Sequence, residues 1–334
     1  MTSISNPTPV WLRRFTKLVA CCTLFLIFAG AMVTSTGSGL AVPDWPLAYG
    51  MVFPPMIAGI FYEHGHRLIA GTVGFLTVIQ AIWLQRREPK RHVRLLGWTA
   101  LGAVIAQGLL GGLTVKLLLP PIVSIAHAGL AEIFLCLNVS IAFFTSVAAA
   151  NLRASQPVDR SFAALRALPV LVYLQILAGA LMRHLGAGGA IPDFPLSMGS
   201  LVPRFTSTAI AVNYAHRVGG LLVATAVLVS LAAMFRSRET AMRRLAVLLT
   251  AVVAVQIYLG ARIVWDGAAD PRIYHSLVGD QALALAKVTS LHVMTGAATL
   301  AISLLCALTA ATLSRRVAAV EEQGSGAAMI EVTA

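Results

Sequence analysis

Apolar residues gather in eight long stretches along this chain, and short polar segments separate them. The stretches cover residues 15–34, 63–84, 95–115, 124–148, 165–185, 213–234, 245–264 and 288–312. Each is close to the roughly 20 residues that an α-helix needs to cross a bilayer core of about 30 Å. The pattern therefore predicts an all-α polytopic membrane protein with eight transmembrane helices.

Basic residues concentrate in every second polar segment. Seventeen of the 25 Lys and Arg fall within residues 13–17, 86–94, 153–166, 236–244 and 315–316. Cytoplasmic loops of membrane proteins carry this excess of positive charge, so we expect both termini in the cytoplasm. The first stretch follows basic residues, as in a signal peptide, but it lacks a cleavage site of small residues and is long enough to span the membrane.

The composition excludes several other classes of protein. Of 334 residues, 25 are Lys or Arg and 13 are Asp or Glu, and the mean hydropathy is +0.82. A soluble domain has roughly 25% charged residues, whereas this chain has 11%, which excludes a soluble enzyme and a disordered chain. The net charge of +12 would suit a nucleic-acid partner only if the basic residues formed one surface. Their place in cytoplasmic loops indicates the lipid bilayer as the partner and no nucleic acid.

The four cysteines, Cys21, Cys22, Cys136 and Cys306, all lie within predicted helices. No pair lies in an outer loop, so the sequence does not indicate a disulfide framework. Residues 317–334 at the C-terminal end are small, polar or acidic, which is typical of disorder. We expect a disordered cytoplasmic tail there.

The chain contains an internal repeat with an offset close to 149 residues. A Pro-Asp-aromatic-Pro-Leu motif at 43–47 returns at 192–196, and Gln107 matches Gln256. An even number of spans per repeat returns the chain to the same side of the membrane, as in parallel repeats. We therefore predict two pseudo-symmetric four-helix bundles, formed by residues 1–155 and 156–316. The two glutamines are expected to form hydrogen bonds between helices.

Four of the eight histidines sit near the outer start of the even-numbered spans: His66 and His127 in the first repeat, His216 and His292 in the second. Polar groups inside a membrane are costly and tend to mark function. Zinc needs three or four ligands close together, and each repeat offers two histidines without a companion cysteine. Haem supplies its own ring nitrogens and takes axial ligands within a helix bundle. The pattern thus predicts one bis-histidine haem site in each repeat.

Charged residues beside these histidines differ between the repeats. Arg67 and Arg217 follow the first histidine of each pair, where a guanidinium could contact a haem propionate or simply extend toward water. Glu63 lies three residues before His66 and so on the same helix face, whereas the matching residue is Asn213. A carboxylate there could transfer protons or stabilise positive charge, or only favour the helix start.

Three further polar residues are weaker candidates. Glu132 is five residues after His127, about 140° around a helix, and so is expected outside that pocket. His184 at the end of the fifth span and His275 in the last outer loop could be part of a proton or electron route, but we expect them at the surface.

Together these motifs resemble the haem A synthase family, the membrane enzymes that complete the haem of cytochrome oxidase. The resemblance extends from residue 25 to residue 312 and rests on an ordered set of motifs rather than on any single one. These are Thr-Gly-Ser-Gly-Leu at 36–40, the motif at 43–47, Glu-His-Gly-His-Arg at 63–67, Gly-Gly-Leu-Thr-Val at 111–115, His127, Arg-His at 183–184, the motif at 192–196, His-Arg at 216–217 and His292.

The resemblance implies a reaction and a division of roles between the repeats. Members of the family oxidise the methyl group at ring position 8 of haem O to a formyl group by successive hydroxylations, which gives haem A. On this mapping His66 and His127 flank the substrate haem O, His216 and His292 ligate a haem b cofactor, and Glu63 is the catalytic carboxylate.

The resemblance also implies a location and partners. The protein is expected in a bacterial-type plasma (inner) membrane, with the haem sites toward the outer face. A haem O synthase would donate the substrate, and cytochrome oxidase or its assembly factors would receive the product. The oligomeric state stays open, a homo-oligomer included.

The outer loops depart from the family. Many members carry a cysteine on each side of the Pro-Asp-aromatic-Pro-Leu motif, and here these places hold Val42 and Ala48, then Ile191 and Ser197. A role of loop thiols in redox coupling or haem transfer is therefore not available to this chain.

Two other functions compete with this one. A di-haem cytochrome b that carries electrons between quinol and a partner would explain four histidines, but not a carboxylate in one repeat alone. A transporter would explain the repeat and the basic loops. Transporters, however, commonly have helices broken near the middle of the membrane, whereas these histidines lie near its outer face.

Overall fold

The computed structural model describes residues 8–152, 162–237, 239–268 and 279–332, which form helices joined by loops and turns, with no β-strand among them. Within this part of the chain, eight helices are long and apolar enough to cross a membrane, which confirms the predicted fold class. They are α1 (Val10–Ser35), α2 (Ala58–Arg87), α3 (Arg91–Lys116), α4 (Pro121–Thr145), α6 (Phe162–His184), α7 (Thr208–Arg236), α8 (Thr240–Ile263) and α10 (Asp280–Val332). The short segments α5 (Val147–Ala150), η1 (Ala187–Gly189) and η2 (Val264–Ala268) complete the described fold.

Local sequence explains where several helices begin and end. α2 ends before Glu88, whose backbone is extended, because the following Pro89 disfavours helical backbone in the residue before it. α4 opens with Pro121 in its first turn, where the missing N–H has no helical partner to lose. Ser207 caps α7 by accepting the backbone N–H of Ile210 at 3.3 Å, which satisfies one of the free donors at the helix start.

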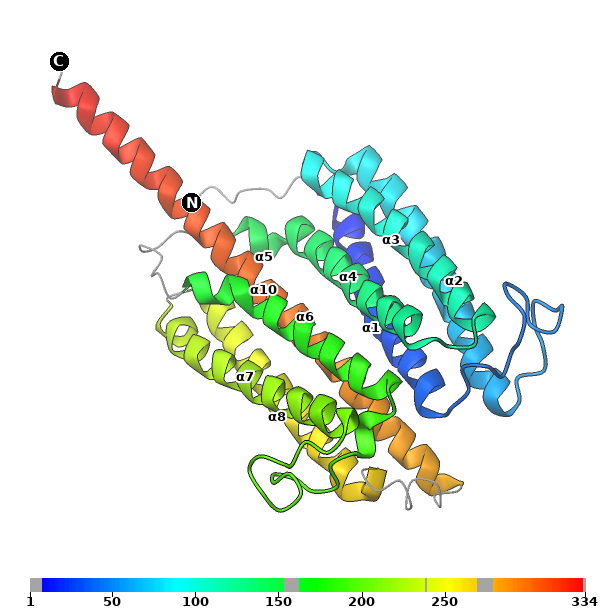
Figure 1. Ribbon diagram of the computed structural model, residues 1–334. Helices are drawn as coiled ribbons and strands as arrows, with labels where there is room; N and C mark the ends of the chain where they lie inside the picture. The colour runs from blue at the N-terminus through cyan, green and yellow to red at the C-terminus, as the bar shows by residue number, and fades with distance from the viewer. Residues whose placement is uncertain (1–7, 153–161, 238, 269–278, 333–334) are drawn as a thin grey trace.

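The long helices run side by side in one elongated bundle (Figure 1). The first four pack on one another, and so do α6, α7, α8 and α10, so each repeat of the sequence supplies four helices in mutual contact. α10 also contacts α1 and α4, and α4 contacts α6. The seam between the two groups is therefore made by α1 and α4 on one side and by α6 and α10 on the other.

Three buried apolar clusters hold the bundle together. One lies among the first four helices around Leu84 and Phe134. A second lies mainly among the last four around Met234 and also includes Phe143 of α4. The third fills the seam around Leu135 of α4 and Ala297 of α10. Lipid tails are as apolar as these side chains, so close packing rather than exclusion of water supplies most of the attraction.

Buried polar side chains join helices of the first half. Gln80 of α2 donates to Asn138 Oδ1 of α4 at 2.8 Å, and Asn138 donates to Thr23 Oγ1 of α1 at 3.4 Å. Gln80 and Asn138 have no exposed surface. Three helices are thus joined through hydrogen bonds that lipid cannot replace.

A polar contact also crosses the seam, near the C-terminal ends of α1 and α6. Arg183 of α6 donates to Ser35 Oγ of α1 at 2.7 Å, and Ser290 of α10 donates to the same oxygen at 2.9 Å. The two halves are therefore connected by hydrogen bonds as well as by apolar packing.

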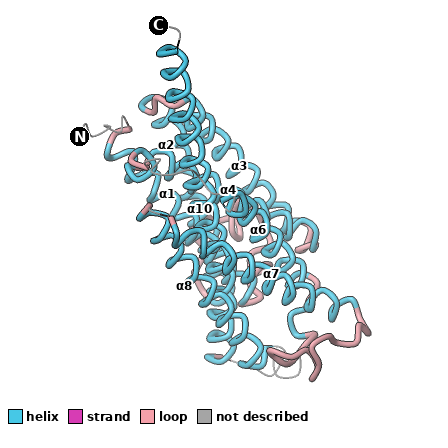
Figure 2. The backbone as a smooth tube through the Cα atoms, turned by 90° about the vertical axis from the view of Figure 1, so that its left-hand side faces the viewer, coloured by secondary structure: helices cyan, strands magenta, loops and turns pink. Residues whose placement is uncertain are grey.

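The C-terminal part of α10 differs from the sequence expectation. We expected disorder over residues 317–334, whereas α10 continues as a helix to Val332 and extends beyond the bundle at the end where α1 begins (Figures 1 and 2). An existing helix extends without the cost of a new nucleus. The Ala, Glu and Gln of this segment are also good helix formers.

Candidate functional site

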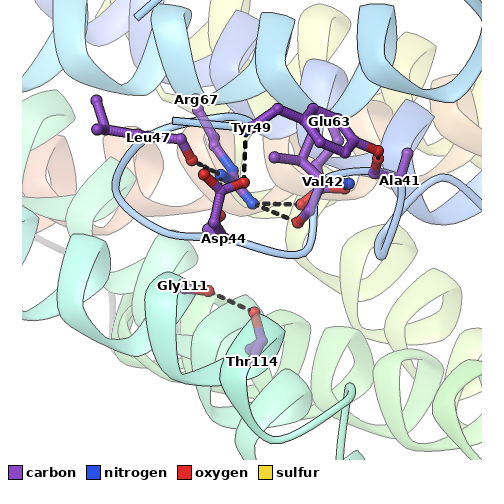
Figure 3. A network of polar contacts seen from close by, with 9 residues as sticks. All are labelled: Ala41, Val42, Asp44, Leu47, Tyr49, Glu63, Arg67, Gly111 and Thr114. Carbon is purple, nitrogen blue, oxygen red and sulfur yellow. Dashed lines mark hydrogen bonds and ion pairs between the residues drawn. The ribbon is translucent and has the colours of Figure 1, made fainter. Parts of the chain in front are cut away.

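Arg67 of α2 binds the loop between α1 and α2, residues 36–57 (Figure 3). Its guanidinium donates to three loop carbonyl oxygens and forms an ion pair with the Glu63 carboxylate at 2.5 Å. The carbonyls are those of Asp44 at 2.7 Å, Leu47 at 3.0 Å and Val42 at 3.1 Å. The loop between α1 and α2 is thereby held against the first turns of α2.

Glu63 is buried between α2 and this loop, with 4% of its surface exposed. One carboxylate oxygen pairs with Arg67, and the other accepts the backbone N–H of Val42 at 2.7 Å. Hydrogen bonds to a charged donor and to the backbone offset the cost of burying a carboxylate. The loop therefore fixes the side chain that the sequence places on the His66 face of the helix.

The second outer loop is held by matching contacts. Arg217 donates through Nε to Asn213 Oδ1 at 3.0 Å and otherwise to three loop carbonyl oxygens. These are Asp193 at 2.6 Å, Ile191 at 2.8 Å and Leu196 at 3.0 Å. Asn213 also donates to two carbonyl oxygens of η1, each at 2.9 Å. An amide can donate, which a carboxylate cannot, so this half replaces the ion pair with hydrogen bonds of an uncharged side chain.

Each loop contains a tight hairpin, residues 44–51 in the first loop and 193–200 in the second, and an aspartate closes it. Asp44 accepts the backbone N–H groups of Tyr49 at 2.7 Å and Gly50 at 2.8 Å, and Asp193 makes the same pair of contacts at 2.6 and 2.8 Å. These hydrogen bonds lower the pKa of both carboxyl groups, and in each hairpin the glycine N–H is the largest cause. Both aspartates are therefore ionised at neutral pH.

The residues that follow Glu63 and Asn213 also bind the loops, just after each hairpin. His64 Nε2 lies 2.8 Å from the carbonyl oxygen of Val52, and the hydroxyl of Tyr214, at the matching position, donates to the carbonyl oxygen of Leu201 at 3.2 Å. His64 is thus bound to the loop, on a different side of α2 from His66.

Each of the four predicted histidine ligands lies against a glycine of a neighbouring helix. The pairs are Gly30 with His66, Gly111 with His127, Gly179 with His216 and Gly260 with His292. A Cβ atom at any of these glycines would lie 2.8 to 3.1 Å from the imidazole Cε1, closer than ordinary van der Waals contact. All four helices of a half therefore build its site, two with a histidine and two with a glycine.

In the second half the two predicted ligands lie side by side. The rings of His216 and His292 have centroids 6.5 Å apart and planes inclined by 74°. Metal–imidazole bonds are about 2 Å long, so two rings on opposite sides of one metal have centroids roughly 6 Å apart. The spacing in the second half fits one metal between the rings.

The donor set indicates which kind of metal centre these pairs can hold. The described residues contain no group of three or more His, Cys, Asp or Glu that could hold a metal ion. Two histidines suffice when the metal brings ring nitrogens of its own, as haem iron does. The residues present therefore fit haem.

Glutamines of α3 and α8 make the predicted contacts between helices. Gln107 Nε2 donates to the backbone oxygen of His127 at 2.9 Å and lies 3.3 Å from its ring Nε2. Gln256 Nε2 lies 3.3 Å from Nε2 of His292 in the same way. Each amide nitrogen therefore lies beside Nε2 of the second histidine of its half.

Comparison with known proteins shows the family of this chain. Residues 57–287 match the sequence profile of COX15-CtaA, described as cytochrome oxidase assembly protein. The chain belongs to this family. A haem A synthase of Symbiobacterium thermophilum is 32% identical over 227 residues, which cover 65% of this chain and 73% of the relative. That of Shouchella clausii is 30% identical over 231 residues (65% and 74%), and that of Listeria monocytogenes is 27% identical over 276 residues (77% and 87%).

This member of the COX15-CtaA family fills the cysteine positions of the outer loops with buried residues. Val42, Ala48 and Ile191 have no exposed surface, and Ser197 has 3%. The four cysteines of the chain are free. These four side chains are therefore packed within the loops.

The other sequence candidates take different places in this COX15-CtaA protein. Glu132 is buried on the face of α4 that carries Gly129, which contacts Tyr173 of α6, and so it faces the seam. His184 is the last residue of α6 and is half-buried. His275 lies outside the described residues. The propionate contacts of Arg67 and Arg217 stay a prediction, because their observed contacts are with the loops.

Two contacts of the sites escaped the sequence analysis. The indole of Trp45 covers Gly112 of α3, where a Cβ would lie 2.7 Å from the ring, beside the glycine that seats His127. Gln175 of α6 contacts both the backbone and the ring of His216. The repeat could have pointed to this glutamine, because the matching residue of the first half is the apolar Leu26 and the two halves therefore differ here.

Proposed function

We propose that this protein is a haem A synthase, an oxidoreductase that converts the methyl group at ring position 8 of haem O to a formyl group. Membership of the COX15-CtaA family supports the proposal, as do relatives with this name at about 30% identity. The observation that carries the assignment of roles is the difference between Glu63 and Asn213. Both residues bind the loop before their helix, Glu63 by accepting the Val42 N–H and Asn213 by donating to the Ala187 carbonyl oxygen, yet one half has an ionisable group there and the other does not.

The first half binds the substrate. His66 and His127 flank haem O, and Glu63 stands one turn before His66 on the same face of α2. A buried carboxylate beside the reacting group can accept protons as the methyl group is oxidised, or stabilise positive charge that develops there. The contacts with Arg67 and the Val42 N–H keep Glu63 in position without using any residue of the second half.

The second half holds the cofactor. His216 and His292 would hold haem b, which would supply one-electron transfer when bound. Asn213 keeps the loop in place with a group that does not ionise, so no proton acceptor stands at this position. This suits a half that passes electrons and leaves its own haem unchanged.

The sites lie toward the outer face of a bacterial-type inner membrane, and both termini lie in the cytoplasm, since basic segments mark that side. Haem O is hydrophobic and reaches the first half from a haem O synthase in the same membrane. The product serves cytochrome oxidase, directly or through its assembly factors. This placement agrees with eight helices of spanning length.

The variant Glu63→Gln tests the proposal. The amide keeps the size of the side chain but neither ionises nor accepts a proton in this range, so haem should still bind. Production of haem A should fall by about a hundredfold or more, the usual contribution of a general acid or base. The measurement is haem extraction and mass analysis from cells that co-express a haem O synthase.

A second carboxylate provides the matched control. Glu132→Gln removes a buried carboxylate of the same half that faces the seam, and it should leave haem A production close to that of the wild type. Wild-type production in Glu63→Gln would contradict the catalytic assignment. Haem b alone in both sites of the wild-type protein would instead favour the di-haem electron carrier.

A further inference from the structure

Trp45 of the first loop packs against α3. A Cβ atom at Gly112 would lie 2.7 Å from both Cδ2 and Cε2 of the indole and 3.1 Å from Cε3. The first two atoms form the bond that the two rings share, so the middle of the indole lies over the glycine. A tryptophan is common at a membrane interface in itself, but that role does not require glycine beneath the ring. The close contact therefore indicates that the indole has a fixed place on α3.

The neighbouring glycine links this contact to the histidine site. A Cβ atom at Gly111 would lie 3.1 Å from Cε1 of the His127 imidazole. Two successive glycines of α3 thus receive two rings, the indole from the loop and the imidazole from α4. A shift of the indole on Gly112 would therefore move the loop relative to the helix on which the His127 ring rests.

The loop segment around Trp45, residues 42–47, is bound to α2 as well. Arg67 donates to three of its carbonyl oxygens, and Glu63 accepts the backbone N–H of Val42. The segment therefore lies between α2 and α3 (Figure 3). It connects the helix that carries the buried carboxylate to the helix that carries the two glycines.

The second half has a different arrangement at the matching positions. Phe194 matches Trp45 and Ala261 matches Gly112, each 149 residues later. Ala261 is buried, so a methyl group stands where the first half has bare backbone. Phe194 packs edge-on against Trp265 of η2, with ring centroids 6.1 Å apart, and the indole N–H donates to the Phe194 carbonyl oxygen at 3.4 Å. The two halves therefore differ by a coordinated pair, tryptophan with glycine against phenylalanine with alanine.

From these contacts we infer that Trp45 is a positioning residue of the first site. Its indole, packed on Gly112, holds the segment that fixes Glu63 at a set place relative to the helix behind His127, and so sets where the carboxylate lies relative to haem O. The inference rests on the proposed function, in which only the first half does chemistry. The half with the carboxylate is also the half with the indole on glycine. Displacement of a group by about 1 Å can lower a reaction rate by about a hundredfold.

The variant Gly112→Ala tests the contact, because the new methyl group would displace the indole. In the full-length protein without haem, exchange of the Val42 amide hydrogen should become at least about tenfold faster, since its hydrogen bond to a charged carboxylate is weakened. With haem O supplied, the variant should still bind it, while the haem A formed per bound haem O should fall by about ten- to a hundredfold.

Gly108→Ala is the matched control. It adds the same methyl group one turn earlier on α3, where no side chain and no backbone of another helix lies within 4 Å among the described residues. Neither the exchange at Val42 nor the formation of haem A should change in this variant.

A double variant tests for rescue. Gly112→Ala with Trp45→Phe installs the pair that the second half uses, and the smaller ring leaves room for the methyl group. Most of the Val42 protection and of the haem A formation should therefore return. Trp45→Ala removes the contact without adding volume, so it should act like Gly112→Ala and does not depend on how that variant folds.

Three results would overturn the inference. These are unchanged Val42 exchange in the folded variants Gly112→Ala and Trp45→Ala, a loss of haem A formation with Val42 protection intact, and a double variant no better than Gly112→Ala. A wild-type protein that forms no haem A would overturn the proposed function instead. The exchange measurement needs no haem, so the two failures are distinct.

Discussion

Glycine at position 179 determines where the His216 ring can lie. In Gly179→Ala the new methyl group would be 2.8 Å from Cε1 of the imidazole, so the ring or the helix must move. We expect haem b retention to weaken by at least about tenfold, as for other changes that misorient a ligand. Pigment content and the low-spin absorbance of the purified variant measure this.

A variant at a second glycine is the control, because it adds the same methyl group to a helix without touching a histidine. Among the described residues, no side chain and no backbone of another helix lies within 4 Å of the Cβ that Gly71→Ala would add to α2. That variant should keep its haem and gain up to about 1 kcal/mol of helix stability. An equal haem content in Gly179→Ala and Gly71→Ala would contradict the proposed role of Gly179 in placing the His216 ring.

The hairpin aspartates confer a defined pH dependence on the outer loops. The pKa of Asp44 is lowered by the N–H groups of Gly50 and then Tyr49, so the ionised form stabilises the closed hairpin. That contribution is present above the unfolded pKa of about 3.9 and is lost as the pH falls through the lower, folded value. Between pH 5 and 8 the hairpin should not respond to pH, and below pH 4 it should loosen.

Amide hydrogen exchange at residues 49 and 50 checks this, after correction for the intrinsic pH dependence of exchange. Asp44→Ala should remove their protection at every pH, while Asp193→Ala should affect only the second hairpin. If the two amides stayed protected in Asp44→Ala, the carboxylate would not be what closes the hairpin.

Sequence reasoning at the residue scale found the histidines because four imidazoles recur at one depth in a repeat. For Arg67 and Arg217 the sequence suggested a propionate contact or extension toward water. It did not suggest that they bind the loops, because the carbonyl oxygens they contact are 20 to 26 residues away in the chain. Those partners depend on the course of a loop, which no periodic pattern encodes. Gln175 was missed for a related reason, since its contact depends on how α6 and α7 are rotated against each other.

At the scale of helices, the hydrogen bond from Gln80 to Asn138 couples α2 to α4. Removing one partner leaves the other buried without it, which costs about 1–3 kcal/mol. We therefore expect Gln80→Leu and Asn138→Leu each to destabilise the protein. The double variant should cost less than the sum, by about 0.6 kcal/mol and at most about 1.7. Unfolding in mixed micelles with increasing dodecyl sulfate provides the free energies, and strictly additive costs would show that the contact does not couple the helices.

The sequence located the helices well and their ends less well. An apolar stretch records how far lipid reaches, whereas the helix continues until a cap or a proline stops it. α2 thus begins at Ala58, five residues before the predicted span. The fourth span was expected to reach residue 148, but α4 stops at Thr145 because Ser146 leaves the helix and caps α5 with its hydroxyl.

At the scale of the whole molecule, the proposed orientation predicts which surfaces reagents can reach. Phe53 in the loop between α1 and α2 is 77% exposed, and Arg91, the first residue of α3, is exposed at the other end of the bundle. In a background without the native cysteines, an impermeant maleimide should label Phe53→Cys on intact cells. It should label Arg91→Cys only after the membrane is opened, and the opposite pattern would invert the topology.

The last helix has a consequence for how the protein is made. The hydrogen bond from Ser290 of α10 to Ser35 of α1 joins residues 255 apart in the chain. At about 5–20 residues per second of synthesis, α1 waits roughly 13–50 s for this partner. Because α10 also contacts α4, α6 and α8, neither half can complete its packing before the ribosome has nearly finished. A prematurely terminated chain that lacks α10 would therefore present open seams to membrane proteases, so quality control can distinguish it from the finished protein.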